Sequence, residues 1–150
     1  MNTQPRTMFH VFTLYALLAS LLGGALSFSP AHAAGGITVN TTADELNSNG
    51  NCALREAIQA ANTNLAVDAC SAGLSSFEDT ITLPAGTYTL TILGAGEELN
   101  ATGDLDITGP LNIIGASAGT TIIQAGATPG SGIDRVFDVY GAIIVSISGV

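Results

Sequence analysis

The sequence predicts an all-β fold, a parallel β-helix with a short N-terminal capping α-helix, and three observations support this prediction. Short strand-like segments separated by glycine turns recur from residue 80 onward. Only residues 52–62 show the clear periodicity of an amphipathic helix. The composition has 18 glycines in 150 residues and only 5% aromatics, which suits many short strands joined by tight turns better than a helical bundle.

Residues 1–33 are predicted to be a signal peptide rather than part of the fold. A positively charged start, an apolar run over residues 11–26 and an A-x-A pattern ending at Ala33 follow one another. The run is slightly short for a membrane span of about 20 residues, and Pro30 favours cleavage over an uncleaved anchor. We therefore expect a secreted or cell-surface protein whose mature chain begins at Ala34 and contains no membrane span.

Residues 34–79 are predicted to form an N-terminal cap, beginning with a short strand over residues 36–40. The helix over residues 52–62 follows, and because it is only about three turns long it needs a surface on which to pack. Its apolar face has the i, i+3, i+4, i+7 spacing and is expected to cover the first rung: Leu54, Ala57, Ile58 and Ala61. Asparagines suited to capping lie near both ends: Asn51, Asn62 and Asn64.

Cys52 and Cys70 are the only two cysteines of the chain. Because an exported protein meets an oxidising environment, a disulfide is the expected state. It would close a loop of about 18 residues and contribute roughly 3 kcal/mol in the chain-entropy model. The alternative is a pair of buried free thiols.

Residues 80–150 are predicted to form the first rungs of the β-helix. Strands are expected at residues 80–83, 87–92, 104–107, 111–114, 120–123, 136–139 and 143–147. Residues 106–111 match residues 138–143 at an offset of 32, and three short strands per offset would make one rung, with inward Ile, Leu and Val stacked into a core. The chain stops inside what reads as a rung, so we expect a truncated sequence.

A β-sandwich with the same short strands is the alternative architecture. Two observations favour the β-helix. The turns are similar from repeat to repeat, and the amphipathic helix precedes all the rungs, where a solenoid needs a cap over its exposed core and strand edges.

Charge restricts the partners and the chemistry. All 12 acidic residues follow the predicted signal peptide, where Arg55 and Arg135 are the only basic residues and Lys is absent. Such a surface repels phosphate backbones and anionic headgroups, so neither nucleic acid nor a membrane surface is an expected partner. His10 and His32 fall inside the signal peptide, which excludes a Ser-His-Asp triad, a Cys-His pair and a His-containing zinc site in the mature chain.

Residues 51–62, NCALREAIQAAN, resemble the CSLREA motif, with Ala53 at the usual Ser position. This motif marks the N-terminal region of exported bacterial proteins with right-handed parallel β-helix, pectin-lyase-like repeats. Residues 79–90 and 111–116 also resemble that family, and the resemblance covers about residues 37–150. It implies a right-handed β-helix and a bond between the two cysteines, and it implies no particular reaction.

Carboxylates are the remaining candidates for chemistry. Asp104 and Asp106 lie two apart on a predicted strand and therefore point to the same face. Such a pair could serve in glycoside hydrolysis or bind Ca²⁺, but a solvated strand edge is the more common setting for acidic residues. We assign no catalytic residue and no cofactor, and keep Ca²⁺ at these two residues as the only candidate ion. Arg55 is expected to pair with the loop rather than to act in catalysis.

The predicted function is that of a non-enzymatic exported module, such as a scaffold, a stalk or an adhesin-type binding module. Its regular surface would suit repeated weak contacts with extracellular glycans or surface proteins. The alternative is the N-terminal part of a polysaccharide lyase or glycoside hydrolase whose catalytic rungs lie beyond residue 150. The fold alone does not decide between them, but an acidic surface repels an acidic pectin chain unless a metal intervenes.

Overall fold

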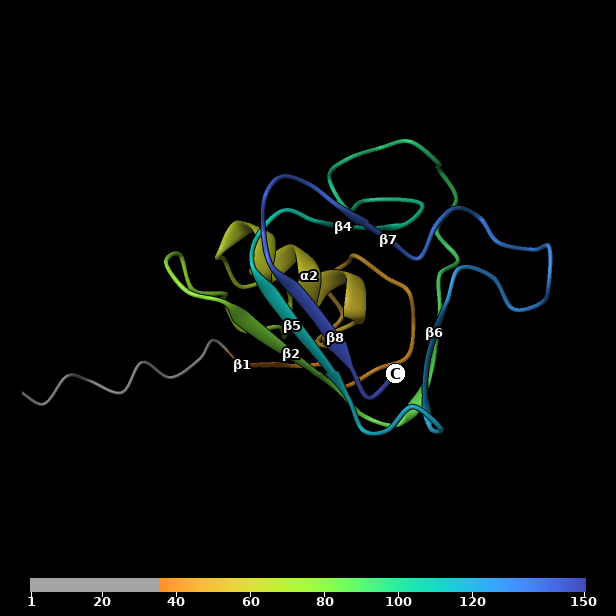
Figure 1. Ribbon diagram of the computed structural model, residues 1–150, viewed down its shortest axis with the longest axis horizontal. Coiled ribbons are helices and arrows are strands. Elements are labelled where there is room, and N and C mark those ends of the chain that lie inside the picture. The colour runs from red at the N-terminus through yellow and green to blue at the C-terminus, as the bar shows by residue number, and fades with distance from the viewer. Residues whose placement is uncertain (1–35) are drawn as a thin grey trace, which may run out of the picture. The chain divides into compact units, whose positions relative to one another are not determined.

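A computed structural model describes residues 36–150 of the chain (Figure 1). The predicted signal peptide, residues 1–33, lies outside the described residues. The elements are β1 (Gly36–Thr38), α2 (Leu54–Thr63), β2 (Asp79–Leu83), β3 (Gly86–Thr89), β4 (Leu105–Ile107), β5 (Leu111–Gly115), β6 (Thr121–Gln124), β7 (Phe137–Val139) and β8 (Val145–Ser148). The prediction of a mainly-β fold with one short helix is therefore confirmed. Within these residues, no helix is long and apolar enough to cross a membrane.

From β2 to β5, each strand pairs with the strand three places further along the chain. β5 pairs with β2, β6 with β3 and β7 with β4, while β8 adds to β5 and β1 adds to the other edge of β2. This gives one four-stranded sheet, in the order β1-β2-β5-β8, and two sheets of two strands each (Figure 1). Each segment predicted as a strand after the helix overlaps one of β2 to β8. All pairings between these strands are parallel, so an antiparallel sandwich does not describe residues 36–150.

The repeat in the sequence corresponds to the register of the strands. Asp106 lies opposite Asp138, which is 32 residues further along the chain. Gly86 lies opposite Thr121, 35 residues further along. The offset varies because loops of different length separate strands that keep their pairing.

Alternation within each strand decides which side chains form the core. In β2, Ile81 and Leu83 have no exposed surface, whereas Thr82 between them is exposed. Ile81 lies between Ile37 of β1 and Ile113 of β5, and both neighbours are also fully buried. Burying a side chain of this kind contributes about 1.5–3 kcal/mol, so this row of isoleucines makes a large contribution to the stability of the four-stranded sheet.

The helix packs against the strands with its apolar face. Among the strands it contacts β4 and β2 most extensively, and Figure 1 shows α2 between the four-stranded sheet and the β4–β7 pair. The four side chains expected to cover the first rung are all buried: Leu54, Ala57, Ile58 and Ala61. The helix therefore lies next to the first set of strands in the chain.

The ends of α2 differ in part from the prediction. The N-terminal cap residue is Ala53 rather than Asn51. Alanine has no side-chain acceptor, but the carboxylate of Glu56 accepts the N–H of Ala53 at 2.9 Å and so satisfies a backbone donor at the start of the helix. At the other end, Asn64 adopts the left-handed conformation (φ 55°) that asparagine tolerates well.

Cys52 and Cys70 form the predicted disulfide, with their Cα atoms 4.8 Å apart. Asp68 reinforces this connection, because its Oδ2 accepts three successive backbone N–H groups, at 2.7–3.1 Å, from Asn49, Gly50 and Asn51. The loop before α2 and the loop after it are thus joined by one covalent bond and by a cluster of charge-assisted hydrogen bonds.

Candidate functional site

The polar side chains of α2 occupy the edge of β4 that does not pair with β7. Asn62 donates to the carbonyl of Asp106 at 2.7 Å and accepts the N–H of Thr108 at 2.9 Å. A neighbouring strand would make the same two bonds. Because an open strand edge leaves backbone groups without partners and invites pairing with other chains, this side chain protects β4.

Arg55 binds the backbone just before β4, next to the edge that Asn62 protects. Its side chain is fully buried and binds both carboxylate oxygens of Asp44, at 2.7 and 3.3 Å. The same guanidinium donates to the carbonyls of Gly103 at 2.8 Å and Asp104 at 2.9 Å. The predicted pairing of Arg55 with the loop is therefore confirmed. Burial raises the pKa of Asp44, but the bond from Arg55 and two backbone N–H groups outweigh burial and hold the pKa below its ordinary value.

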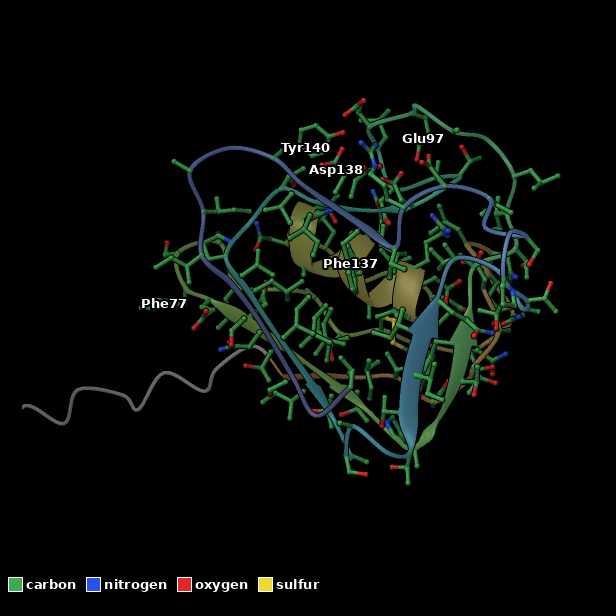
Figure 2. The ribbon with its side chains drawn as sticks, turned by 45° about the vertical axis from the view of Figure 1, so that its right-hand side comes forward. Phe77, Glu97, Phe137, Asp138 and Tyr140 are labelled. Carbon is green, nitrogen blue, oxygen red and sulfur yellow. A yellow bond between two sulfur atoms is a disulfide. The ribbon has the colours of Figure 1, made fainter. Side chains whose placement is uncertain are left out.

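Three carboxylates meet on the outward face of β4. We call them the acidic cluster: Glu98, Asp106 and Asp138. One oxygen from each lies within 4.8 Å of the others. Asp106 and Asp138 come from paired positions of β4 and β7, whereas Glu98 comes from the loop that precedes β4. Figure 2 shows Asp138 beside Tyr140, whose hydroxyl donates to Asp138 Oδ2 at 2.8 Å.

The solvated strand edge predicted for Asp104 and Asp106 is wrong, because both residues are 0% exposed. The loop before β4 folds over them, and the backbone N–H of Asn100 donates to Asp106 Oδ2 at 2.8 Å. The carboxylate of Glu97 shapes this loop, since it accepts the backbone N–H groups of Leu99, Ala101 and Thr102. A chain segment, rather than water, therefore covers the outward face of β4.

The region carries more negative charge than its arginine neutralises. The guanidinium of Arg135 bridges Asp104 Oδ2 at 2.8 Å and Asp138 Oδ2 at 2.9 Å. Burial raises the pKa of Asp106 to about 6; the hydrogen bond from Asn100 opposes this rise, and neighbouring carboxylates, Asp104 first among them, add to it. The ionised form of Asp106 is thus less stable than that of an exposed carboxylate, and a positive charge close by would stabilise it.

Unpaired acceptor atoms occur at Asp106 and at three other residues, two of which lie in the chain just before it. Among residues 36–150, four buried side-chain atoms have no hydrogen-bond partner: Asn100 Oδ1, Asp104 Oδ1, Asp106 Oδ1 and Asp134 Oδ2. All four are oxygens, so only a donor or a cation can satisfy them. Leaving such an atom buried and unpaired costs about 1–3 kcal/mol.

This arrangement suits the binding of a cation better than catalysis. A carboxylate that acts on a glycosidic bond has to contact the sugar, and Asp104 and Asp106 have no exposed surface through which to do so. Carboxylate and amide oxygens are, in contrast, the ligands that Ca²⁺ takes in proteins.

A separate feature is an open cleft of about 380 Å³ near the C-terminal end of α2, lined by residues that include Asn62, Phe77, Asp79 and Thr108. Asp79 is buried, accepts the N–H of Leu74 at 2.9 Å, and has its pKa raised by burial. The volume falls within the range of small-molecule sites, about 300–1,000 Å³. The residues that line the cleft include none of Glu98, Asp106 and Asp138, and Figure 2 shows Phe77 well away from Asp138.

Comparison of the chain with protein-family models, with curated proteins and with solved structures gives no match. The assignment of a function therefore depends on the geometry described above.

The sequence predicts Asp104 and Asp106 as candidate carboxylates, whereas the structure brings Asp106 together with Glu98 and Asp138. A signal for Asp138 was present, because the 32-residue repeat aligns it with Asp106. No comparable signal exists for Glu98, whose position depends on how the loop before β4 folds.

Proposed function

We propose that this chain is an exported, non-enzymatic structural or binding module, namely a scaffold, stalk or adhesin-type part of a secreted or cell-surface protein. In this proposal residues 36–150 form a right-handed parallel β-helix of the CSLREA-motif kind, and α2 is its cap. The observation that carries the proposal is the stack of parallel strands whose free β4 edge is covered by side chains of α2.

The charged residues of the CSLREA-like segment support a structural role. Arg55 forms an ion pair with Asp44 and donates hydrogen bonds to backbone carbonyls. Glu56 is fully buried and accepts the N–H groups of Ala53 and Asn47, each at 2.9 Å. Both side chains therefore hold the cap together and are not available to a substrate. The disulfide agrees with folding in an oxidising compartment.

The outer face of the four-stranded sheet offers a regular surface for a partner. Its outward positions form a row of exposed, uncharged side chains in register across β1, β2, β5 and β8: Thr38, Thr82, Ile114 and Ser148. The row presents an uncharged side chain at each strand, and three of the four carry a hydroxyl group, which suits repeated weak contacts with extracellular glycans or surface proteins.

Export is tested by expressing the full chain in a bacterial host and analysing the exported fraction by mass spectrometry. We expect a chain that begins at Ala34 and carries no alkylatable thiol before reduction. A chain that stays in the cytoplasm with residues 1–33 attached would contradict the export part of the proposal.

The absence of chemistry and the binding surface are tested with the same preparation on a panel of polysaccharides. We expect binding without turnover, and we expect Thr82→Glu to weaken it because a charge then interrupts the exposed row. Thr87→Glu is the matched control, since Thr87 is an exposed threonine of β3, which belongs to another sheet. Cleavage of any polysaccharide by the purified chain would overturn the non-enzymatic proposal.

A further inference from the structure

We propose that the acidic cluster of Glu98, Asp106 and Asp138 is a Ca²⁺ site that fastens the loop over residues 93–104 to β4 and β7. This inference does not depend on the proposed function, because it concerns an ion held by three side chains of the described residues, wherever the protein works.

The spacing of the three carboxylates fits one shared ion. Ca²⁺ binds oxygen at about 2.3–2.6 Å, so two oxygens that share the ion lie at most about 5 Å apart. The three oxygens already lie within 4.8 Å of one another. The ion would therefore fit with little movement of the side chains.

A second observation points to a missing positive group at the same place. Asp106 is 0% exposed and its carboxylate belongs to the cluster, yet only Oδ2 has a partner, the N–H of Asn100. Its Oδ1 is buried without a hydrogen bond, and so are the Oδ1 atoms of Asp104 and Asn100 in the same segment. A proton on Asp106 would satisfy this one oxygen, whereas a cation would bind carboxylate oxygens of Asp106, Glu98 and Asp138 at once.

Charge also favours a divalent ion. Asp104, Asp106, Asp138 and Glu98 bring four carboxylates to this region, while Arg135 supplies one guanidinium that binds Asp104 and Asp138. Arg55, the other arginine nearby, is paired with Asp44. A divalent cation would offset most of the charge that remains.

The geometry favours Ca²⁺ over Mg²⁺. Mg²⁺ requires nearly ideal octahedral coordination, whereas Ca²⁺ accepts six to eight oxygens in irregular arrangements. Here the ligands come from two strands and one loop, and Glu98 is exposed, which leaves room for water to complete the coordination. Sites of this kind in extracellular modules bind Ca²⁺ with Kd values of about 10⁻⁴–10⁻³ M.

The ion would connect three parts of the fold. β4 and β7 are the paired strands of one sheet, separated by about 30 residues of chain, and Glu98 lies in the loop before β4. The same loop contains Asn100, whose side chain donates to the carbonyl of Arg55 in α2 at 2.8 Å. Binding of Ca²⁺ would thus strengthen the link between the helix and the strands as well as the loop itself.

The test is calorimetric titration of the purified full chain with CaCl₂ after treatment with EDTA, with the melting temperature followed in parallel. We expect one ion per chain, an affinity near the range given above, and a melting temperature that rises with Ca²⁺. Asp138→Asn and Glu98→Gln should each weaken binding about tenfold or more, as loss of a charged ligand does. Hydrogen exchange of the amides of residues 93–104 should slow when Ca²⁺ is present.

Glu78→Gln is the matched control, because Glu78 is an exposed carboxylate outside the acidic cluster and its replacement removes the same charge. It should leave the affinity unchanged. Glu98→Gln keeps the test decisive if Asp138→Asn fails to fold, since Glu98 is exposed. Absence of binding at 5 mM CaCl₂, binding that both variants leave unchanged, or equal affinity for MgCl₂ would overturn the proposal.

Discussion

Replacing Arg55 with alanine removes a fully buried guanidinium from between Asp44 and the backbone that leads into β4. In the native protein this group holds both oxygens of Asp44 and the carbonyls of Gly103 and Asp104. Asp44 then keeps only the two backbone N–H groups of Thr91 and Ile92 and loses its counter-ion, while the two carbonyls lose the guanidinium. Alanine cannot admit enough water to replace this group without opening the contact between α2 and the loop. We therefore expect a large loss of stability.

The size of the loss follows from the groups left behind. The carboxylate of Asp44 is only 2% exposed, and removing one partner of a buried ion pair costs about 3–5 kcal/mol. The unpaired carbonyls add to this, at about 1–3 kcal/mol for each that stays buried. Because such costs are not additive, we expect about 4–6 kcal/mol in total, which is a large part of the roughly 5–15 kcal/mol that stabilises a typical native protein.

Urea denaturation followed by circular dichroism measures this change. Arg55→Lys is the first control, because it keeps the charge beside Asp44 but lacks the planar fork that reaches the carbonyls, and it should lose less. The second is the double variant Arg55→Ala with Asp44→Asn, which removes the uncompensated charge and should recover part of the stability. A loss below about 1 kcal/mol for Arg55→Ala would be the size expected for a solvent-exposed ion pair and would refute this reasoning. Failure of the double variant to recover any stability would refute it as well.

Three further predictions concern the cap and its surroundings. Reduction of the bond between Cys52 and Cys70 should lower the free energy of unfolding by about 3 kcal/mol, and alkylation should label both thiols only after a reductant is added. Gly103→Ala should destabilise the protein by at least about 1 kcal/mol, because Gly103 has φ +64° and an added Cβ would lie 2.6 Å from the carbonyl oxygen of Gly94. Gly109→Ala is its control, because within the described residues an added Cβ there meets no atom within 4 Å. The pKa of Asp44 is held below its ordinary value of 3.8 in the folded protein, so the ionised form favours folding. This contribution should be complete above pH 3.8 and be lost as the pH falls through that value and below it. Asp44→Asn should flatten this acid dependence in urea denaturation curves, and an unchanged curve would contradict it.

The elements were predictable because their signals are local. In β2 the side chains alternate between buried and exposed, so the sequence DTITL reads as a half-buried strand. In α2 the apolar residues recur at the helical spacing, and those residues are buried. The repeat of 32 residues also predicted which strands pair, since Asp106 lies opposite Asp138.

The environment of Asp104 and Asp106 was not predictable in the same way. Strand alternation places both side chains on the outward face, and side chains on an outward face are expected to be exposed to solvent. Their burial depends on the loop before β4, whose path is set by the bonds of Glu97 to nearby backbone N–H groups and by the contact of Asn100 with α2. Such bonds depend on three-dimensional proximity, which periodicity in the sequence does not encode.

The repeat nevertheless indicates one feature of this environment, namely two aligned carboxylates. A parallel stack in which Asp106 aligns with Asp138 places two carboxylates side by side, and like charges in adjacent strands destabilise a sheet. A fold that keeps such a pair needs a compensating positive group. Arg135 meets this need for Asp138, because its guanidinium binds Asp138 directly, whereas Asp106 keeps one buried oxygen without a partner. A repeat that aligns acidic residues is therefore a reason to look for a cation, in addition to being evidence for the fold.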